Sequence, residues 1–368
     1  MPNSRPRALL LSALAVAASL SATAARAQKV PQGFSTERLY LSAPGGGWFV
    51  MDDLDMHGGL GGAVALTTGY ARNPLRISDS RGSFAVVSDQ AFIDFGFALT
   101  YYRFRLYLSL DAPLVVTGQS GSVGDFEYVA PSVGLGSTPD TLGDARIGTD
   151  VRLWGGPRSP LRLGVGAQLL VPVGSQTNYV NGSYVGSNYQ TDGTYRGMLR
   201  LLGAGDVGRF TYAAQFGVHV RPLDDGITPG SPRGSELLFG VAAGSRLRVG
   251  HTGATAVVLG PEVFGESALR SLFGGTTTGV EGLMTARVEG TADDGPQLRL
   301  KLGAGGGLDA QFGAPEWRLV LGLELFDRGT DRDHDGVTNQ HDACPDRAGI
   351  RTRDPATNGC PEVTPSPP

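Results

Sequence analysis

A run of aspartates near the C-terminal end of the sequence has the residue types and spacing of a calcium loop. It reads DRDHDGVTNQHD from Asp331 to Asp342, with aspartate at positions 1, 3, 5 and 12 and glycine at position 6. Because Ca²⁺ takes six to eight oxygen ligands, alternating carboxylates around a sharp glycine bend suit it. The expected ligands are the carboxylates of Asp331, Asp333, Asp335 and Asp342 and the carbonyl of Val337. An acidic, solvated linker is the alternative interpretation.

The chain has two cysteines, Cys344 and Cys360, and both lie near the C-terminal end. A secreted chain enters an oxidising compartment, where paired cysteines form disulfides. No His and Cys spacing around them resembles a zinc site. The sequence therefore favours a disulfide over two free thiols or a metal pair.

The N-terminus has the three parts of a secretory signal peptide. Arg5 and Arg7 are followed by a short apolar run over residues 8–20, and Ala25-Arg26-Ala27 fits a small-x-small cleavage site. The apolar run is short for a membrane-spanning helix. Cleavage after residue 27 is therefore favoured over an N-terminal anchor.

Between these two ends the sequence alternates with a period of two, which is the period of a β-strand. In residues 144–153, apolar Ala145, Ile147 and Val151 alternate with charged residues such as Asp144 and Arg146. The pattern recurs twelve times, over residues 58–70, 90–101, 104–116, 144–154, 161–173, 195–204, 209–221, 236–249, 252–263, 278–290, 297–305 and 316–326. Residues 71–89 are the place where a further hairpin is most expected.

Repeated apolar and charged faces behind a secretion signal predict an all-β fold, an antiparallel transmembrane β-barrel of about 12 strands. The apolar face then contacts lipid, and short turns alternate with longer loops, as in outer-membrane barrels. An even strand count places both ends of the barrel on the periplasmic side. The charged face lines the lumen, where interleaved charges can either fill the interior or line a pore; the expected lumen charges are Arg103, Arg105, Asp144, Arg146, Asp150, Arg152, Arg162, Arg246, Arg248, Arg299 and Lys301.

Composition excludes several classes of protein. A net charge of -4 and a pI near 5.8 give no basic surface for nucleic acid. After the signal peptide no stretch of about 18 apolar residues remains, which excludes helical membrane spans. The GxGxxG match at Gly203–Gly208 lies at a predicted hairpin and precedes another strand, so we do not interpret it as a dinucleotide site. No Ser/His/Asp or paired-carboxylate constellation is evident, and we predict that the protein is not an enzyme.

The spacing DxDxDGxxNxxDxCPD from Asp331 to Asp346 resembles the thrombospondin type 3 repeat. Together with the signal peptide, the strand start Leu142-Gly143-Asp144 and the barrel pattern, it makes residues 1–361 similar to OmpA-family proteins with large N-terminal barrels. The resemblance implies Ca²⁺ as the bound ion, the Asp331–Asp342 ligand set above, and a bond between Cys344 and Cys360. It also implies a Gram-negative outer-membrane location, with lipid and cell-wall or envelope components as partners. The family's C-terminal peptidoglycan-binding domain is not found here, which puts wall anchoring in doubt.

The predicted organisation is a signal peptide over 1–27, a lead-in over 28–57 and the barrel over 58–326. A thrombospondin type 3-like repeat over 327–361 and a proline-rich tail over 362–368 follow. The expected function is an outer-membrane barrel, structural or passively pore-forming, with a periplasmic calcium-binding repeat. The alternatives are a calcium-dependent adhesion or interaction protein of the cell surface, and a soluble secreted β-protein whose apolar faces form a sandwich core.

Overall fold

The computed structural model describes most of the chain from Phe34 onward. The described residues are 34–56, 60–79, 82–124, 126–134, 142–157, 159–180, 183–223, 234–249, 255–290, 296–309, 313–327, 331, 333, 335–339 and 341–362. The predicted signal peptide, the start of the lead-in and residues 363–368 lie outside them. No helix in the described part of the chain is long and apolar enough to cross a membrane.

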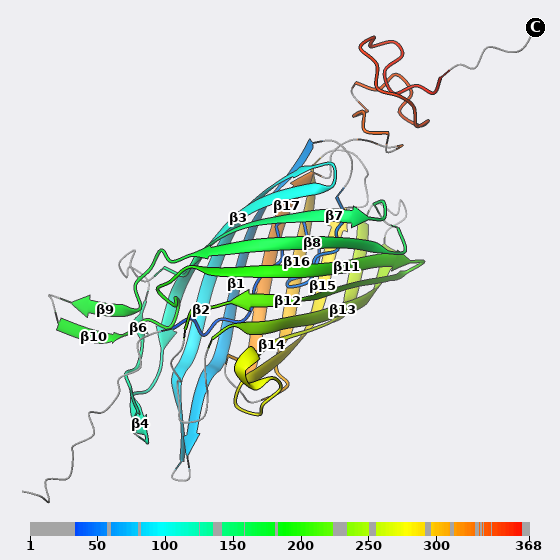
Figure 1. Cartoon of the computed structure of the whole chain (residues 1–368). Coiled ribbons are helices and arrows are strands. Elements are labelled where there is room, and N and C mark those ends of the chain that lie inside the picture. The colour runs from blue at the N-terminus through cyan, green and yellow to red at the C-terminus, as the bar shows by residue number, and fades with distance from the viewer. Residues whose placement is uncertain are drawn as a thin grey trace, which may run out of the picture.

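Twelve antiparallel strands form a closed barrel (Figure 1). Closure follows from the pairing of β1 with both β17 and β2, and of β2 with β3, so that no strand in this ring has a free edge. The barrel strands are β1 (Leu60–Asp79), β2 (Gly82–Tyr101), β3 (Phe104–Thr117), β7 (Ala145–Trp154), β8 (Arg162–Val171), β11 (Arg196–Val207), β12 (Phe210–Val220), β13 (Glu236–Val249), β14 (Thr255–Ala268), β15 (Thr278–Gly290), β16 (Gln297–Gly307) and β17 (Trp317–Asp327). The all-β, twelve-stranded prediction is confirmed.

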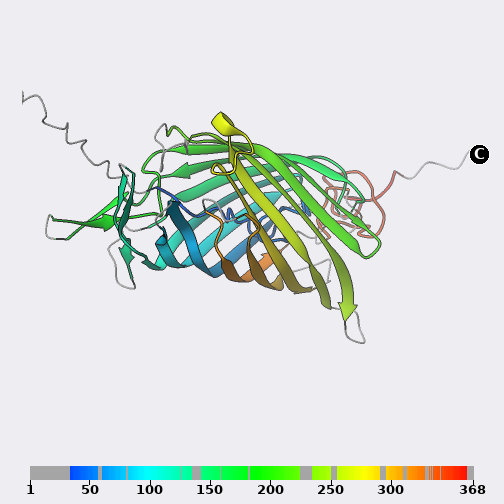
Figure 2. The same cartoon turned by 90° about the horizontal axis from the view of Figure 1, so that it is seen from below.

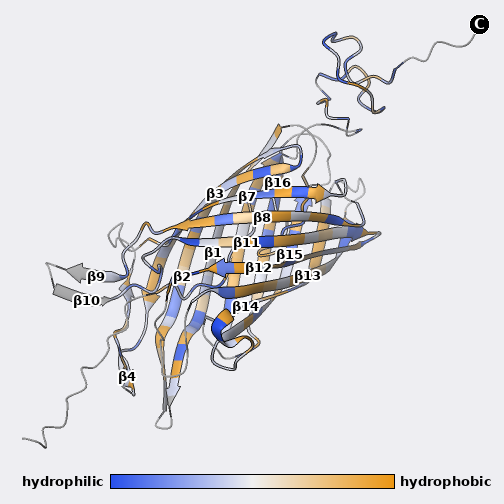
Figure 3. Ribbon diagram, in the orientation of Figure 1, coloured by the Kyte–Doolittle hydropathy of each residue, from blue (hydrophilic) through white to orange (hydrophobic). Residues whose placement is uncertain are grey.

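Hydrophobic and hydrophilic residues are interspersed along the barrel strands (Figure 3), and they lie on different faces. In β17, Leu319, Leu321 and Leu323 are 41–52% exposed on the outside, while Arg318 and Glu324 are 1% exposed on the inside. Successive side chains of a strand point to opposite faces, so the sequence alternation becomes an apolar exterior and a charged interior. An apolar exterior around a polar interior is the arrangement of membrane barrels, and it is the reverse of a soluble sandwich.

The connections differ between the two ends of the barrel. At one end, here called the turn end, short connections such as Tyr102–Arg103 join the strands, and the barrel begins at Leu60 and finishes at Asp327. At the other end, here called the loop end, longer connections carry the small strands β4 (Gly121–Val123), β5 (Phe126–Tyr128), β6 (Ser132–Val133), β9 (Thr177–Val180) and β10 (Ser183–Ser187), and the 3₁₀ helix Leu269–Ser271. The predicted alternation of short and long connections is therefore present except between β1 and β2, where the expected longer loop over 71–89 is wrong because only two residues separate Asp79 from Gly82.

Residues 71–89 do not form a separate hairpin. They lengthen β1 and β2 to 20 residues each, and the two strands pair as far as Asp79 and Gly82. Register shifts near Leu75 interrupt the ladder. These irregularities interrupt the alternation of apolar and polar residues. The first strand was therefore predicted to end at residue 70, whereas β1 continues to Asp79.

The segment predicted as a simple lead-in lies inside the barrel. We call its described residues, 34–56, the plug, and Figure 2 shows this blue segment within the ring of strands. Phe34 packs with Tyr189 among loop-end residues, with ring centroids 5.4 Å apart. Since Leu60 begins β1 at the turn end, the chain passes through the whole length of the lumen before the first strand.

The segment after β17 folds around a disulfide beyond the turn end (Figure 1). Cys344 and Cys360 are bonded, with an S–S distance of 2.01 Å. Tyr102, in the β2–β3 turn, donates a hydrogen bond from its hydroxyl to the Gly336 carbonyl at 2.7 Å, and Arg351 donates to that carbonyl at 2.8 Å. The aspartate loop thus contacts the rim of the barrel.

Candidate functional site

The centre of the plug is a tight loop made possible by Pro44 and the three glycines after it. Gly46 N–H donates to the Ala43 carbonyl at 2.8 Å, and Ser42 N–H donates to the Phe49 carbonyl at 2.7 Å. Gly47 has a φ of 92° and no room for a side chain, since a Cβ there would lie 2.2 Å from an Asp53 carboxylate oxygen. Glycine is the residue that adopts this left-handed conformation readily.

Basic side chains of the wall hold the plug by its backbone. Arg146 donates to the Leu41 carbonyl at 2.6 Å, and Arg162 donates to the Asp53 carbonyl at 2.8 Å. Carbonyl groups buried without a donor are costly, so an irregular segment in a closed interior needs donors from its surroundings. The inward-facing arginines of the barrel strands supply them.

Ion pairs between plug and wall add to these contacts. Asp52 pairs with Arg105 at 2.5 Å, and both side chains are at most 3% exposed. Arg38 bridges Glu236 and Glu266 at 3.0 and 2.7 Å. Removing one member of a buried pair leaves an uncompensated charge, which is strongly destabilising. The wall is therefore stable only with the plug in place.

One wall carboxylate, Glu262, accepts hydrogen bonds from consecutive backbone N–H groups of the plug, as an anion does when it is bound by a turn. Its two oxygens accept the N–H groups of Phe49 and Val50, each at 2.9 Å, and its Oε1 also accepts the Thr285 hydroxyl at 2.7 Å. Hydrogen bonds to a carboxylate are stronger than those between neutral groups. Glu262 therefore fixes the middle of the plug.

Aromatic plug residues complete the filling of the lumen. Trp48 and Phe49 are fully buried, with the Arg287 guanidinium 5.1 Å from the Trp48 ring centroid and the Lys301 amine 5.0 Å from that of Phe49. Wall glycines make space for them, since a Cβ at Gly303 would lie 2.9 Å from Phe49. The largest apolar cluster of the described residues lies here, between plug and wall.

Most of the predicted lumen charges do face the interior. Arg105, Asp144, Arg146, Asp150, Arg152, Arg162, Arg299 and Lys301 are buried. Arg103 lies exposed in the β2–β3 turn, and Arg248 lies exposed near the end of β13; these two placements were wrong because both lie where the barrel wall ends. The sequence analysis missed the acidic partners Glu262 and Glu324, although their alternation with apolar neighbours was a usable signal.

A buried group of His219, Glu236 and Glu266 brings three potential metal ligands within 4.8 Å of one another. Its carboxylates already accept hydrogen bonds from Arg38, and Glu236 also from Arg221 at 3.0 and 3.1 Å. Two guanidinium groups supply the positive charge that a metal would bring. The group is an ion-pair network that anchors the plug.

Three of the carboxylates predicted to bind calcium lie close together. Carboxylate oxygens of Asp331, Asp333 and Asp335 lie within 4.8 Å of one another, and Gly336 has the left-handed φ of 91° that the sharp bend requires. Asp342 is outside this group. Burial, followed by repulsion from Asp335, raises the pKa of Asp333 and of Asp342.

No protein-family model and no curated protein matches the chain. Among solved structures it is similar to an outer-membrane channel from Pseudomonas putida F1, with 14% identity and a TM-score of 0.43, over 74% of this chain and 95% of that one. It is also similar to the NanC porin, with 4% identity and a TM-score of 0.40, over 72% and 98% of the two chains. With TM-scores below 0.5, these likenesses support no substrate or activity for this chain.

Proposed function

We propose that the protein is an outer-membrane β-barrel of a Gram-negative envelope that is closed at rest by its own N-terminal segment. The observation that carries the proposal is the plug, whose Trp48, Phe49 and Met51 are fully buried in the lumen. The closed ring and its apolar exterior support a membrane location, because only closed barrels and helices satisfy all backbone groups in lipid. Passive permeation then requires displacement of residues 34–56.

Single-channel recording in planar bilayers tests the closed state. We expect the full-length protein to show no steady conductance, and a variant lacking residues 28–56 to conduct. Migration on a gel before and after boiling provides the folding control, because a closed barrel migrates faster unheated. If the deletion variant does not fold, the paired variants Glu262→Gln and Asp52→Asn replace it, and we expect brief openings from them. Steady conductance of the full-length protein would contradict the proposal.

We further propose that residues 331–342 bind Ca²⁺ on the periplasmic side. The support is the mutual proximity of three carboxylates and the Gly336 bend, together with the buried Oδ2 of Asp333, which has no hydrogen-bond partner among the described residues. Calorimetry of the full-length protein in detergent should show binding that Asp333→Asn weakens and that the control Glu362→Gln leaves unchanged. No heat at millimolar Ca²⁺ would leave an acidic linker.

Calcium-dependent adhesion is the second candidate function. It requires the tail, and hence the turn end, to face the outside of the cell. Protease treatment of intact cells distinguishes the two: a protected tail supports a periplasmic location, and cleavage after Phe326 on intact cells supports adhesion.

A further inference from the structure

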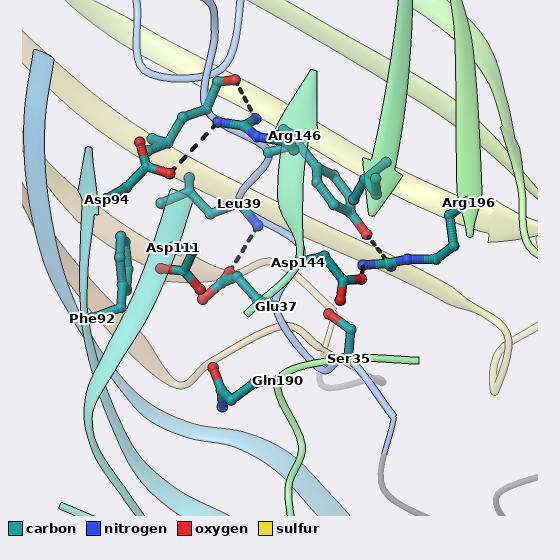
Figure 4. Close-up of a pocket in the computed structure, with 13 residues that line it drawn as sticks. Ser35, Glu37, Leu39, Phe92, Asp94, Asp111, Asp144, Arg146, Gln190 and Arg196 are labelled. Carbon is teal, nitrogen blue, oxygen red and sulfur yellow. Dashed lines mark hydrogen bonds and ion pairs between the residues drawn. The ribbon is translucent and has the colours of Figure 1, made fainter. Parts of the chain in front are cut away.

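A small cavity remains between the plug and the barrel wall toward the loop end (Figure 4). Its volume is about 50 Å³, and its walls come from the plug and from strands β2, β3, β7, β8 and β11. Four carboxylates line it, those of Glu37, Asp94, Asp111 and Asp144. Such a concentration of acidic groups in a small space needs compensating positive charge.

Three of the four carboxylates have an arginine partner. Glu37 accepts two hydrogen bonds from Arg318, at 2.9 and 3.0 Å. Asp144 pairs with Arg196 at 2.5 Å. Asp94 pairs with Arg146 at the longer distance of 3.8 Å.

Asp111 is the exception. Its Oδ1 is buried and has no hydrogen-bond partner within the described part of the chain. Asp144 also directs an oxygen without a hydrogen-bond partner, Oδ1, from a side chain that is only 2% exposed. The arginines are themselves shared, since Arg318 also pairs with Glu281 at 2.6 Å and Arg196 also pairs with Asp192 at 3.5 Å. The cavity therefore keeps a surplus of negative charge, and the Oδ1 atoms of Asp111 and Asp144 are acceptors without a hydrogen-bond partner among the described residues.

We propose that this cavity is a binding site for a single monovalent cation, Na⁺ or K⁺, held against Asp111. The available ligand atoms are oxygens, which suit hard cations and not the softer transition metals. The surplus of negative charge favours a cation. In the described residues, the groups of three acidic or histidine ligand atoms within 4.8 Å of one another lie elsewhere, so the compact carboxylate cage that favours Ca²⁺ is not formed here.

The cation would join the plug to the wall. The cavity includes Ser35 and Glu37 of the plug on one side and Asp111 and Asp144 of the wall on the other. An ion that binds only when both sides are in place stabilises the plugged state by mass action. The inference is independent of whether the barrel conducts.

Thermal unfolding of the full-length protein in detergent tests this site. Midpoints are compared in NaCl, KCl and choline chloride at equal ionic strength, with EDTA present so that the aspartate loop stays free of divalent ions. We expect a saturable upward shift of the midpoint in Na⁺ or K⁺ relative to choline. Asp111→Asn should abolish the shift, and Asp111→Ser serves if the amide variant does not fold. Asp206→Asn, which removes the partner of Arg162 near the turn end, should lower the midpoint but keep the shift.

A proton bound to Asp111 would also remove negative charge from the cavity. The thermal midpoints and the infrared spectrum distinguish this alternative from a bound cation. Wild type would then show equal midpoints in all three salts, and an infrared carboxylic-acid band that Asp111→Asn removes. That outcome overturns the proposal. Persistence of the shift in both Asp111 variants also overturns it, since the cation would then bind elsewhere.

Discussion

The barrel wall and the plug both contribute buried residues to the lumen, yet their patterns in the sequence differ. Each wall strand faces lipid on one side and the lumen on the other, which forces a period of two, as in Leu319, Leu321 and Leu323 against Arg318 and Glu324. The plug is surrounded on all sides by the inner face of the barrel wall. Its residues 48–51, WFVM, show no alternation of apolar and polar residues. A period of two therefore appears only where a segment lies between two different surroundings, here lipid and lumen. A segment that lies wholly in the lumen has no such period.

The largest effect should come from breaking a plug–wall ion pair. Arg105→Ala leaves Asp52 buried without its partner, and we expect a loss of about 3–5 kcal/mol in the free energy of unfolding. Denaturant unfolding in detergent measures it. The double variant Arg105→Ala with Asp52→Asn should recover part of the loss, because no unpaired charge remains. If Arg105→Ala lowers the free energy of unfolding by less than a substitution at an exposed residue does, the plug is not part of the stable barrel.

The next effect concerns the outer face of the wall. Leu323→Arg, near the middle of β17, should cost about 2–4 kcal/mol because a charge is placed in lipid. The matched control is Val207→Arg at the end of β11, where the cost should fall to about 0–1 kcal/mol. Unfolding in lipid vesicles provides the comparison. Equal tolerance at both positions would contradict the lipid-facing orientation.

A smaller effect should separate glycines that face the plug from glycines that face lipid. Gly303→Val places a side chain against Phe49, and overpacking of this kind costs about 1–3 kcal/mol. At Gly197 a Cβ would meet its nearest neighbour at 3.8 Å, so Gly197→Val should be nearly neutral. Thermal midpoints of the two variants test this. If Gly303→Val is as stable as Gly197→Val, the contact between Phe49 and the wall is not tight.

Calcium should have the smallest effect, and it should be confined to the tail. At ten times the dissociation constant, a ligand that binds only the folded form stabilises it by about 1.4 kcal/mol. Proteolysis of the tail should therefore slow at millimolar Ca²⁺, while the barrel midpoint stays unchanged. Slower proteolysis that persists in Asp333→Asn would show that the aspartate loop is not responsible.

The wall could be predicted from sequence because each strand carries its own evidence in a dozen residues. The plug could not be predicted, because the residues that hold it are distant in the sequence. Glu262, which accepts a hydrogen bond from the Phe49 N–H, lies 213 residues away from it. The Asp111 cavity was equally out of reach, because the side chains that line it come from the plug and several strands. The disulfide and the proximity of Asp331, Asp333 and Asp335 could be predicted because these residues are close together in the chain.

The path of the plug also bears on how the molecule is assembled. Phe34 is at the loop end, and β1 begins at the turn end, so the ring of strands encircles a piece of its own chain. Threading a loose chain end through a finished barrel would be slow, because connections rarely pass through closed loops. The natural order is for residues 34–56 to be enclosed at the moment when β1 pairs with β17. The seam between the first and last strands is then the place where the order of assembly is decided, and a tag on the N-terminal side of Phe34 should emerge at the opposite rim from a tag after Cys360.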